Sequence, residues 1–184
     1  YGEPAARRDR NLQYILSLKS ENLLLSHYFE AGLISFTSRP KEIHWGWDSP
    51  LSEIRGTVVG HWLSAASHLY RETGNKQLKQ KADWIVSEIG RCQRENGGQW
   101  AFPIPEKYLH WLKNGKTTWA PQYVCQKNMM GLLDMYLNAE NEEALAIVKK
   151  CADWFFDFTN DISREVMNEM MEVQETGAMM QHFA

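Results

Sequence analysis

Apolar residues recur every three or four positions along most of the chain, which is the period of an amphipathic helix. From residue 58 they form two adjacent stripes that predict a broad buried helix face: Val58, Trp62, Ala65, Leu69 and Val59, Leu63, Ala66, Tyr70. Ser49-Pro50 offers a start, since proline in a first turn loses no hydrogen bond, and Gly74 offers a stop. A second helix, from about Leu78 to Asn96, would complete a helical hairpin.

The same unit recurs in the second half of the chain. Its two predicted helices carry the apolar residues Val124, Met129, Leu132, Leu133, Tyr136 and Leu145, Val148, Ala152, Phe155, joined by a polar turn over 138–141. Tyr70 to Asn75 matches Tyr136 to Asn141 at an offset of 66 residues, and Ala82-Asp83-Trp84 matches Ala152-Asp153-Trp154 at an offset of 70. The pattern therefore indicates a duplicated α-hairpin.

The rest of the chain adds helices and no strands. A helix is predicted from Asn11 to Glu30 and a short one over 163–173, and no segment of length alternates apolar and polar residues. Repeated hairpins build either an open solenoid or a closed toroid, and the common solenoid repeats are shorter, at about 34 to 47 residues. The sequence predicts one all-α domain over 1–184, the N-terminal part of an (α/α)6 toroid.

Two long connections interrupt the helices, at 36–50 and 97–121. Both are aromatic and rich in glycine and proline, and loops of this length inside a compact domain are usually functional. Both precede a predicted helix start. In a toroid they would therefore gather at the end of the barrel to which the helix N-termini point.

Charge and cysteine content exclude several classes of protein. The formal net charge is -3, with 20 Lys and Arg against 23 Asp and Glu, so a nucleic-acid partner is not expected. No apolar run is long enough to span a membrane, and no signal peptide is visible, so no membrane partner is expected either. Cys92, Cys125 and Cys151 lack a CxxC pair. We expect buried thiols, and no metal site or other cofactor in this chain.

The eight tryptophans permit two explanations, a large core or a cleft lined by rings that pack on a sugar. Trp47 and Asp48 stand just before a predicted helix, where rings could pack on a sugar and the carboxylate could accept from its hydroxyls. The alternative is that the ring packs on the helix beneath while Asp48 or Ser49 caps it.

His61 lies on a third, polar face of its predicted helix, with Thr57, Ser64 and His68. Lining a cavity, it would hydrogen-bond a ligand hydroxyl; otherwise it is a solvated or backbone-satisfied histidine. At the matching junction of the second hairpin we select Trp119, Tyr123 and Gln126 as binding candidates. Tyr123 and Gln126 are three residues apart and share a face, whereas Cys125 falls on the apolar stripe. No pair of carboxylates suited to glycoside hydrolysis stands out.

Several segments, taken in order, are similar to one family. They are Gly46-Trp47-Asp48, then Arg55 to Ala65 with an RGxxxGH motif, Trp119 to Lys127 with a WAPxY motif, Leu132 to Tyr136, and Glu175 to Gln181. The chain resembles bacterial glycoside hydrolases typified by β-L-arabinofuranosidase, whose catalytic barrel has six α-hairpins. The resemblance implies a carbohydrate substrate and matches His61 to a substrate-contacting histidine of that family.

The resemblance also implies a retaining mechanism, with a cysteine nucleophile, a zinc ion held by Cys and Glu, and a Glu acid and base. These belong to a Glu-x-Cys segment and a Cys-Cys pair, and neither is present in this sequence. The chain also begins without methionine and ends where a helix starts. We therefore expect a truncated catalytic barrel that is inactive alone, with zinc bound only in a longer protein.

Two departures from the family pattern leave the substrate open. Gln126 replaces a usual histidine, and Gly177 to Gln181 replaces a usual GGMNE segment; glutamine hydrogen-bonds but cannot titrate. They imply either an altered substrate or lost activity. Another six-hairpin enzyme, such as an unsaturated uronide hydrolase or a sugar epimerase, and a non-catalytic helical-repeat interaction module stay open as alternatives.

Overall fold

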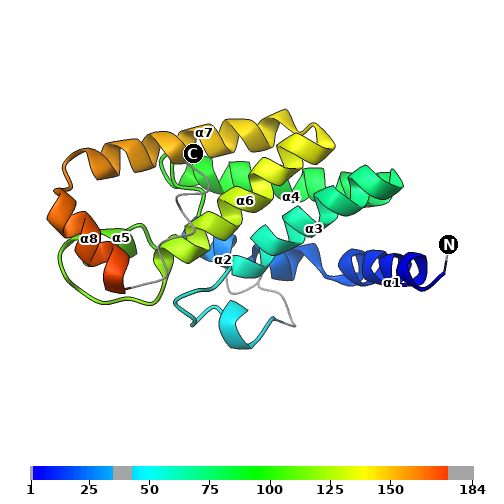
Figure 1. The fold of residues 1–184 in the computed structure, drawn as a ribbon, viewed down its shortest axis with the longest axis horizontal. Helices are drawn as coiled ribbons and strands as arrows, with labels where there is room; N and C mark the ends of the chain where they lie inside the picture. Colours follow the sequence, from blue (N-terminus) through cyan, green and yellow to red (C-terminus); the bar gives the residue numbers. More distant parts are fainter. Residues whose placement is uncertain (1, 35–42, 174–184) are drawn as a thin grey trace.

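The fold is that of a computed structural model, which describes residues 2–34 and 43–173. Within these ranges the chain is helical and contains no strand, as the sequence predicts. The elements, shown in Figure 1, are α1 (Glu3–Ser17), α2 (Ser20–Glu30), the 3-10 helix η1 (Gly46–Asp48), α3 (Thr57–Thr73), α4 (Lys76–Glu95), α5 (Lys107–Lys113), α6 (Pro121–Ala139), α7 (Glu142–Asn160) and α8 (Arg164–Val173).

The two predicted hairpins are present, as α3 with α4 and α6 with α7. Asn75 and Asn141 cap the second helix of each, accepting the backbone N–H of Leu78 at 2.9 Å and of Ala144 at 2.8 Å. Gly74 ends α3 in the left-handed conformation with φ 64°, and Glu140 ends α6 in the same way with φ 54°. The shared cap and turn confirm that the hairpin is repeated.

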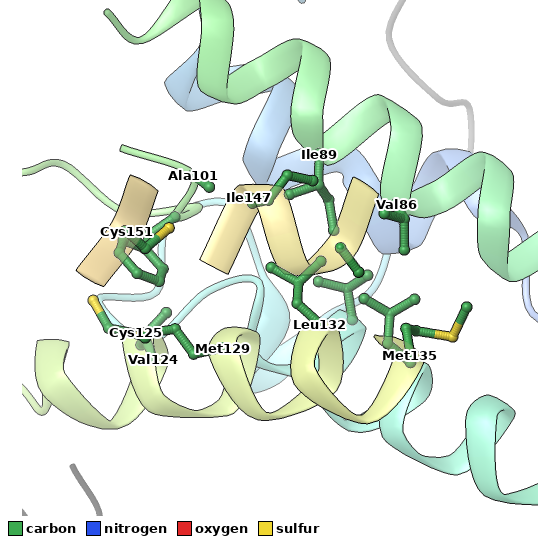
Figure 2. Packing of buried hydrophobic residues seen from close by; sticks show 14 of the residues in the cluster. Val86, Ile89, Ala101, Val124, Cys125, Met129, Leu132, Met135, Ile147 and Cys151 are labelled. Carbon is green, nitrogen blue, oxygen red and sulfur yellow. The ribbon is translucent and has the colours of Figure 1, made fainter. Parts of the chain in front are cut away.

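The hairpins pack in two layers, with α3 beside α6 and α4 beside α7 (Figure 1). The apolar core lies between the layers. Figure 2 shows Val86 and Ile89 from α4 and Ile147 from α7 meeting Leu132 and Met135 from α6. All five are at most 3% exposed, so this core holds the repeat together.

Two glycines allow the backbones of α3 and α6 to touch. A Cβ atom added at Gly60 would lie 2.2 Å from the carbonyl oxygen of Lys127, and one added at Gly131 would lie 2.3 Å from the carbonyl oxygen of Gly60. Real Cβ atoms do not approach oxygen that closely, so no larger residue fits either position. The second glycine of the RGxxxGH motif therefore sets the distance between the two helices.

The predicted helix from Asn11 to Glu30 is wrong, because the chain breaks between α1 and α2. Leu18 is extended, with φ -65° and ψ 128°. The carbonyls that α1 leaves free receive partners from distant elements: Trp62 Nε1 donates to Ile15 O at 3.0 Å, and Lys81 Nζ donates to Leu16 O at 2.9 Å. These contacts satisfy the end of α1 without a continuing helix.

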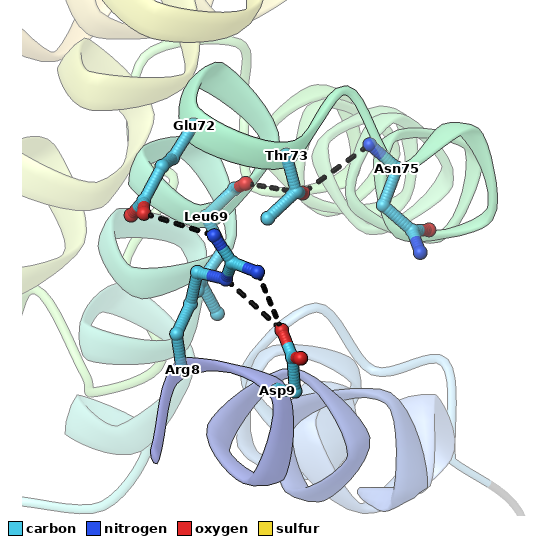
Figure 3. A network of polar contacts seen from close by, with 6 residues as sticks. All are labelled: Arg8, Asp9, Leu69, Glu72, Thr73 and Asn75. Carbon is cyan, nitrogen blue, oxygen red and sulfur yellow. Dashed lines mark hydrogen bonds and ion pairs between the residues drawn. The ribbon is translucent and has the colours of Figure 1, made fainter. Parts of the chain in front are cut away.

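Polar contacts at the surface join α1 to the far end of α3 (Figure 3). Arg8 donates to Asp9 at 2.8 Å and lies 3.4 Å from Glu72, while the Thr73 hydroxyl accepts the N–H of Asn75 at 3.3 Å. Exposed ion pairs of this kind contribute about 0 to 1 kcal/mol each. These ion pairs therefore add little to the stability of the fold.

The predicted start of α3 at Ser49-Pro50 is also wrong. The helix begins at Thr57, after a stretch of turns, because Gly56 takes a left-handed conformation with φ 73° and its N–H donates to Asp48 Oδ1 at 2.8 Å. A Cβ at Gly56 would also lie 2.4 Å from Pro103. Glycine is therefore required at the first glycine of RGxxxGH for two reasons: the backbone is left-handed, and Pro103 leaves no room for a Cβ atom.

The connection over 97–121 contains a helix that the sequence analysis missed, α5. Trp100, Phe102 and Ile104 precede it and are at most 2% exposed, and Trp100 packs on Trp154 with ring centroids 4.7 Å apart. The first part of this connection is therefore core rather than an open functional loop. The predicted helix over 163–173 is present as α8. None of the described helices is both long and apolar enough to cross a membrane.

Candidate functional site

His61 on α3 and Tyr123 on α6 come together where the two helices begin. The Tyr123 hydroxyl lies 3.4 Å from His61 Nε2, and His61 is exposed while Tyr123 is partly buried. The close approach at Gly60 places the first turns of the parallel helices side by side, so residues 62 positions apart in sequence share one surface. The pair brings an imidazole and a phenol to one surface.

Burial and charge keep the His61 imidazole neutral at pH 7. Although the residue is exposed at the surface, neighbouring protein atoms desolvate the ring and lower its pKa from 6.5, and the positive charge of Lys127 lowers the pKa further. The Lys127 ammonium lies 5.1 Å from the centre of the Tyr123 ring. A neutral imidazole offers one hydrogen-bond donor and one acceptor, as a sugar hydroxyl does. The arrangement is suited to binding a hydroxylated, uncharged ligand.

Trp47 and Trp119 lie at the same junctions, one before α3 and one before α6. Their rings meet edge to face, with centroids 5.9 Å apart and an interplanar angle of 89°. They are 72% and 42% exposed, so both keep free apolar surface. Exposed aromatic rings that group together are a feature of interaction sites.

Glu53 ties the two junctions together, and sequence reasoning did not single it out. Its carboxylate accepts the backbone N–H of Trp119 at 3.1 Å and the Thr118 hydroxyl at 3.5 Å. The sequence gives little indication of this role, because Glu53 stands in the short segment Leu51 to Arg55, which has no helical or strand periodicity. Its contacts nevertheless fix Trp119 relative to the segment that leads into α3.

Asp48 organises the segment that leads into α3. The side chain is buried, one oxygen accepts the Gly56 N–H at 2.8 Å, and the other lies 3.2 Å from His44 Nδ1. Burial raises the pKa of Asp48, and the contacts with His44 and the backbone oppose that shift. Neither Asp48 nor Ser49 caps α3, so the capping alternative is wrong, and a sugar contact by Asp48 stays a prediction.

Gln126 lies apart from the surface formed by His61 and Tyr123. It is 1% exposed, and its Oε1 atom has no hydrogen-bond partner. Gln122, one turn earlier on α6, is likewise buried with an unpartnered Oε1. Cys125 is fully buried, as predicted, and burial raises the pKa of its thiol well above the usual range. Tyr123 and Gln126 therefore do not open on one surface.

A polar seam continues along α3 and α6 beyond His61. The Ser64 hydroxyl donates to Asp134 Oδ2, and His68 Nε2 lies 3.8 Å from the same oxygen. Asp134 was not a candidate from the sequence, where it stands within an apolar run, Leu-Leu-Asp-Met. A single carboxylate within an apolar run could have indicated a polar contact at this position. The predicted polar face of α3 thus has a partner on α6.

The described residues contain no group of three or more His, Cys, Asp and Glu side chains placed to hold a metal ion. Cys92, Cys125 and Cys151 are buried and free. Burial raises the pKa of both Cys92 and Cys151 to about 12, so both thiols are protonated at neutral pH. These residues do not fit a zinc site.

Comparison with known proteins assigns the family. A family model described as the catalytic domain of GH127 β-L-arabinofuranosidase matches residues 4–184, nearly the whole chain. The chain belongs to the GH127 family. No curated protein matches it. Membership confirms the resemblance carried by the RGxxxGH and WAPxY motifs, and the all-helical structure fits the α/α toroid of a GH127 domain.

GH127 membership makes the domain a glycoside hydrolase domain with a carbohydrate substrate. Of the classes that the sequence left open, this favours the hydrolase over a helical-repeat interaction module. One of the two departures from the family pattern, Gly177 to Gln181, lies outside the described residues, as do residues 35–42 of the first long connection.

Proposed function

We propose that this chain supplies the N-terminal part of the barrel of a β-L-arabinofuranosidase-like hydrolase, together with one wall of its sugar-binding cleft. The observation that carries the proposal is the contact of His61 with Tyr123, 3.4 Å apart, at the junctions that also hold Trp47 and Trp119. A neutral imidazole and a phenol can bind hydroxyls, while free ring faces can pack on the C–H face of a sugar. The substrate is a plant-type glycan containing arabinose or a similar sugar.

The chemical steps belong to other residues. No Glu-x-Cys or Cys-Cys segment is present in the sequence, and the cysteines that are present are buried thiols with raised pKa values. The role of the described residues is to bind and orient the sugar. A zinc ion would be held by residues of a longer protein, outside the residues described.

His61→Ala in a full-length protein is expected to lower kcat/KM by about 2 kcal/mol, roughly 30-fold, because a hydrogen bond to substrate inside a cleft is lost. The melting temperature should barely move, since His61 is exposed and its contact with Tyr123 is long. Steady-state kinetics on an arabinofuranoside and a thermal melt measure the two effects.

His110→Ala provides the matched control for that substitution. His110 is an exposed histidine on α5 that also has one long polar contact, 3.5 Å from Glu106. Its kinetics should stay at the wild-type level. If His61→Ala leaves kcat/KM intact and lowers the melting temperature instead, His61 is a structural residue and the proposed cleft is wrong.

The 184-residue chain alone is expected to hydrolyse no glycoside, because it lacks the segments that would carry the nucleophile and the metal. Release of p-nitrophenol from p-nitrophenyl arabinofuranoside should equal the rate in buffer. The His61→Ala chain, assayed in parallel, identifies hydrolysis by a contaminating enzyme, since such a background would not respond to the substitution. A wild-type rate above buffer that falls in His61→Ala would show that the chain is a complete enzyme.

A further inference from the structure

A buried asparagine, Asn128, joins α6 to the start of α3. Its side-chain nitrogen Nδ2 donates to Gly56 O at 3.2 Å and, within its own helix, to Val124 O at 2.9 Å. The residue is 2% exposed. We propose that Asn128 is a positioning residue, which fixes the first turns of α3, and with them His61, against α6. The consequence for sugar binding rests on the proposed function.

The two acceptors fix the orientation of the Asn128 amide. Both are carbonyl oxygens, so a flipped amide would place its own oxygen against two acceptors. The ring of His27 from α2 lies beside the same amide: burial lowers the pKa of His27, and the Asn128 amide opposes that shift. Asn128, His27 and Gly56 are all buried. A carbonyl that loses its donor in such a place finds no water to replace it, so the bond to Gly56 resists opening.

Gly56 is held through both of its backbone polar groups. Its N–H donates to Asp48 Oδ1 at 2.8 Å, and its carbonyl accepts from Asn128. Gly56 is the N-cap of α3, so the helix begins at this residue. Helical hydrogen bonds join each residue to the one four positions along. A side chain that holds the N-cap therefore also sets the position of His61 in the turns that follow.

The contact between His61 and Tyr123 does not set its own geometry. Its length of 3.4 Å exceeds the usual range of hydrogen bonds, about 2.5 to 3.2 Å. The placement of the two rings therefore comes from the helices that carry them. The close approach at Gly60 limits how near these helices come, and Asn128 adds a directional bond at the end where both rings lie.

Asn128→Ser removes the bond between the helices and spares the bond within α6. A serine hydroxyl can donate to the carbonyl four residues back, here Val124 O, but is too short to reach Gly56 O. We expect the nuclear Overhauser effect between the His61 and Tyr123 rings, measured by NMR on the 184-residue chain, to be lost. The dissociation constant of methyl β-L-arabinofuranoside should rise about 10-fold, the effect of losing one well-placed hydrogen bond.

Asn138→Ser is the matched control. Asn138 is another asparagine of α6 that bonds to α3, through Ser67 Oγ at 3.1 Å, but at the far end of both helices. This variant should keep the ring contact and the wild-type affinity. Loss of the ring contact in both variants would reflect a general loosening of the helix pair and would overturn the inference. A wild-type ring contact in Asn128→Ser would overturn it as well.

Two further measurements separate the inference from folding and from the proposed function. In the wild-type chain, the side-chain amide protons of Asn128 should exchange with solvent far more slowly than those of the exposed Asn114. Equal rates would contradict the buried bonds without any substitution.

The double variant Asn128→Ser with His61→Ala should bind the arabinofuranoside as His61→Ala alone does, because Asn128 acts through His61. A further loss of affinity would mean that Asn128 acts by another route, against the inference. If His61→Ala leaves the dissociation constant unchanged while Asn128→Ser still removes the ring contact, Asn128 positions His61 and the proposed sugar cleft is wrong.

Discussion

Replacing Gly60 by alanine is expected to destabilise the protein by about 2 kcal/mol. The new Cβ would lie 2.2 Å from the Lys127 carbonyl oxygen, and because that oxygen is backbone, α3 and α6 would have to move apart. Overpacking of this kind costs about 1 to 3 kcal/mol and sometimes more, which exceeds the gain of about 1 kcal/mol from alanine's helix propensity. Urea unfolding measures the change in free energy.

Gly90→Ala is the matched control, since Gly90 also lies within a helix at a helix contact. Its Cβ would meet the ends of the flexible side chains of Glu143, at 3.0 Å, and Ile147, at 3.2 Å. The free energy of unfolding should change by about 1 kcal/mol or less, because these side chains can turn aside. Equal losses in Gly60→Ala and Gly90→Ala would mean that the backbones of α3 and α6 do not touch.

Acidification from pH 7 to pH 5 is expected to lose about 2 kcal/mol of stability through His27 alone. This residue of α2 is 1% exposed, and neither ring nitrogen has a hydrogen-bond partner. Burial lowers its pKa to about 3, against the weaker opposing effect of the Asn128 amide. The unfolded chain takes up the proton below pH 6.5 while the folded chain does not, so stability is full above pH 6.5 and is lost toward pH 3.

His27→Gln separates this effect from other titrating groups. Burial raises the pKa of Asp48 and of Glu30, so their protonation offsets part of the loss in both chains. The difference between the two pH profiles, measured by urea unfolding at pH 7, 6 and 5, isolates His27. His110→Gln, at an exposed position, should keep the wild-type profile. Parallel profiles for wild type and His27→Gln would contradict a buried neutral His27.

The sequence predicts those parts of the fold that are determined by neighbouring residues. The hairpins were predictable because their caps are local: Asn75 and Asn141 each accept an N–H three residues ahead. The break after α1 was not, because its carbonyls are satisfied by Trp62 and Lys81 from helices far along the chain. The start of α3 was missed for the same reason, since the partner of Asp48 is eight residues away at Gly56.

The candidate site divides in the same way. His61 was a candidate from the polar face of one helix, and the structure brings it to Tyr123. The residue pattern of one helix does not show which other elements cover that helix. Gln126 was therefore predicted to share a binding surface with Tyr123, although its side chain is buried. Asp134 was missed because its partners, Ser64 and His68, stand on the other hairpin. Whether these residues bind sugar stays a prediction.

One carboxylate links the two segments that lead into α3 and α6. Glu53 precedes α3, and it accepts the backbone N–H of Trp119 and the Thr118 hydroxyl just before α6. A displacement of either segment is therefore passed to the other through Glu53, so this residue can affect the position of Trp119 without touching a ligand.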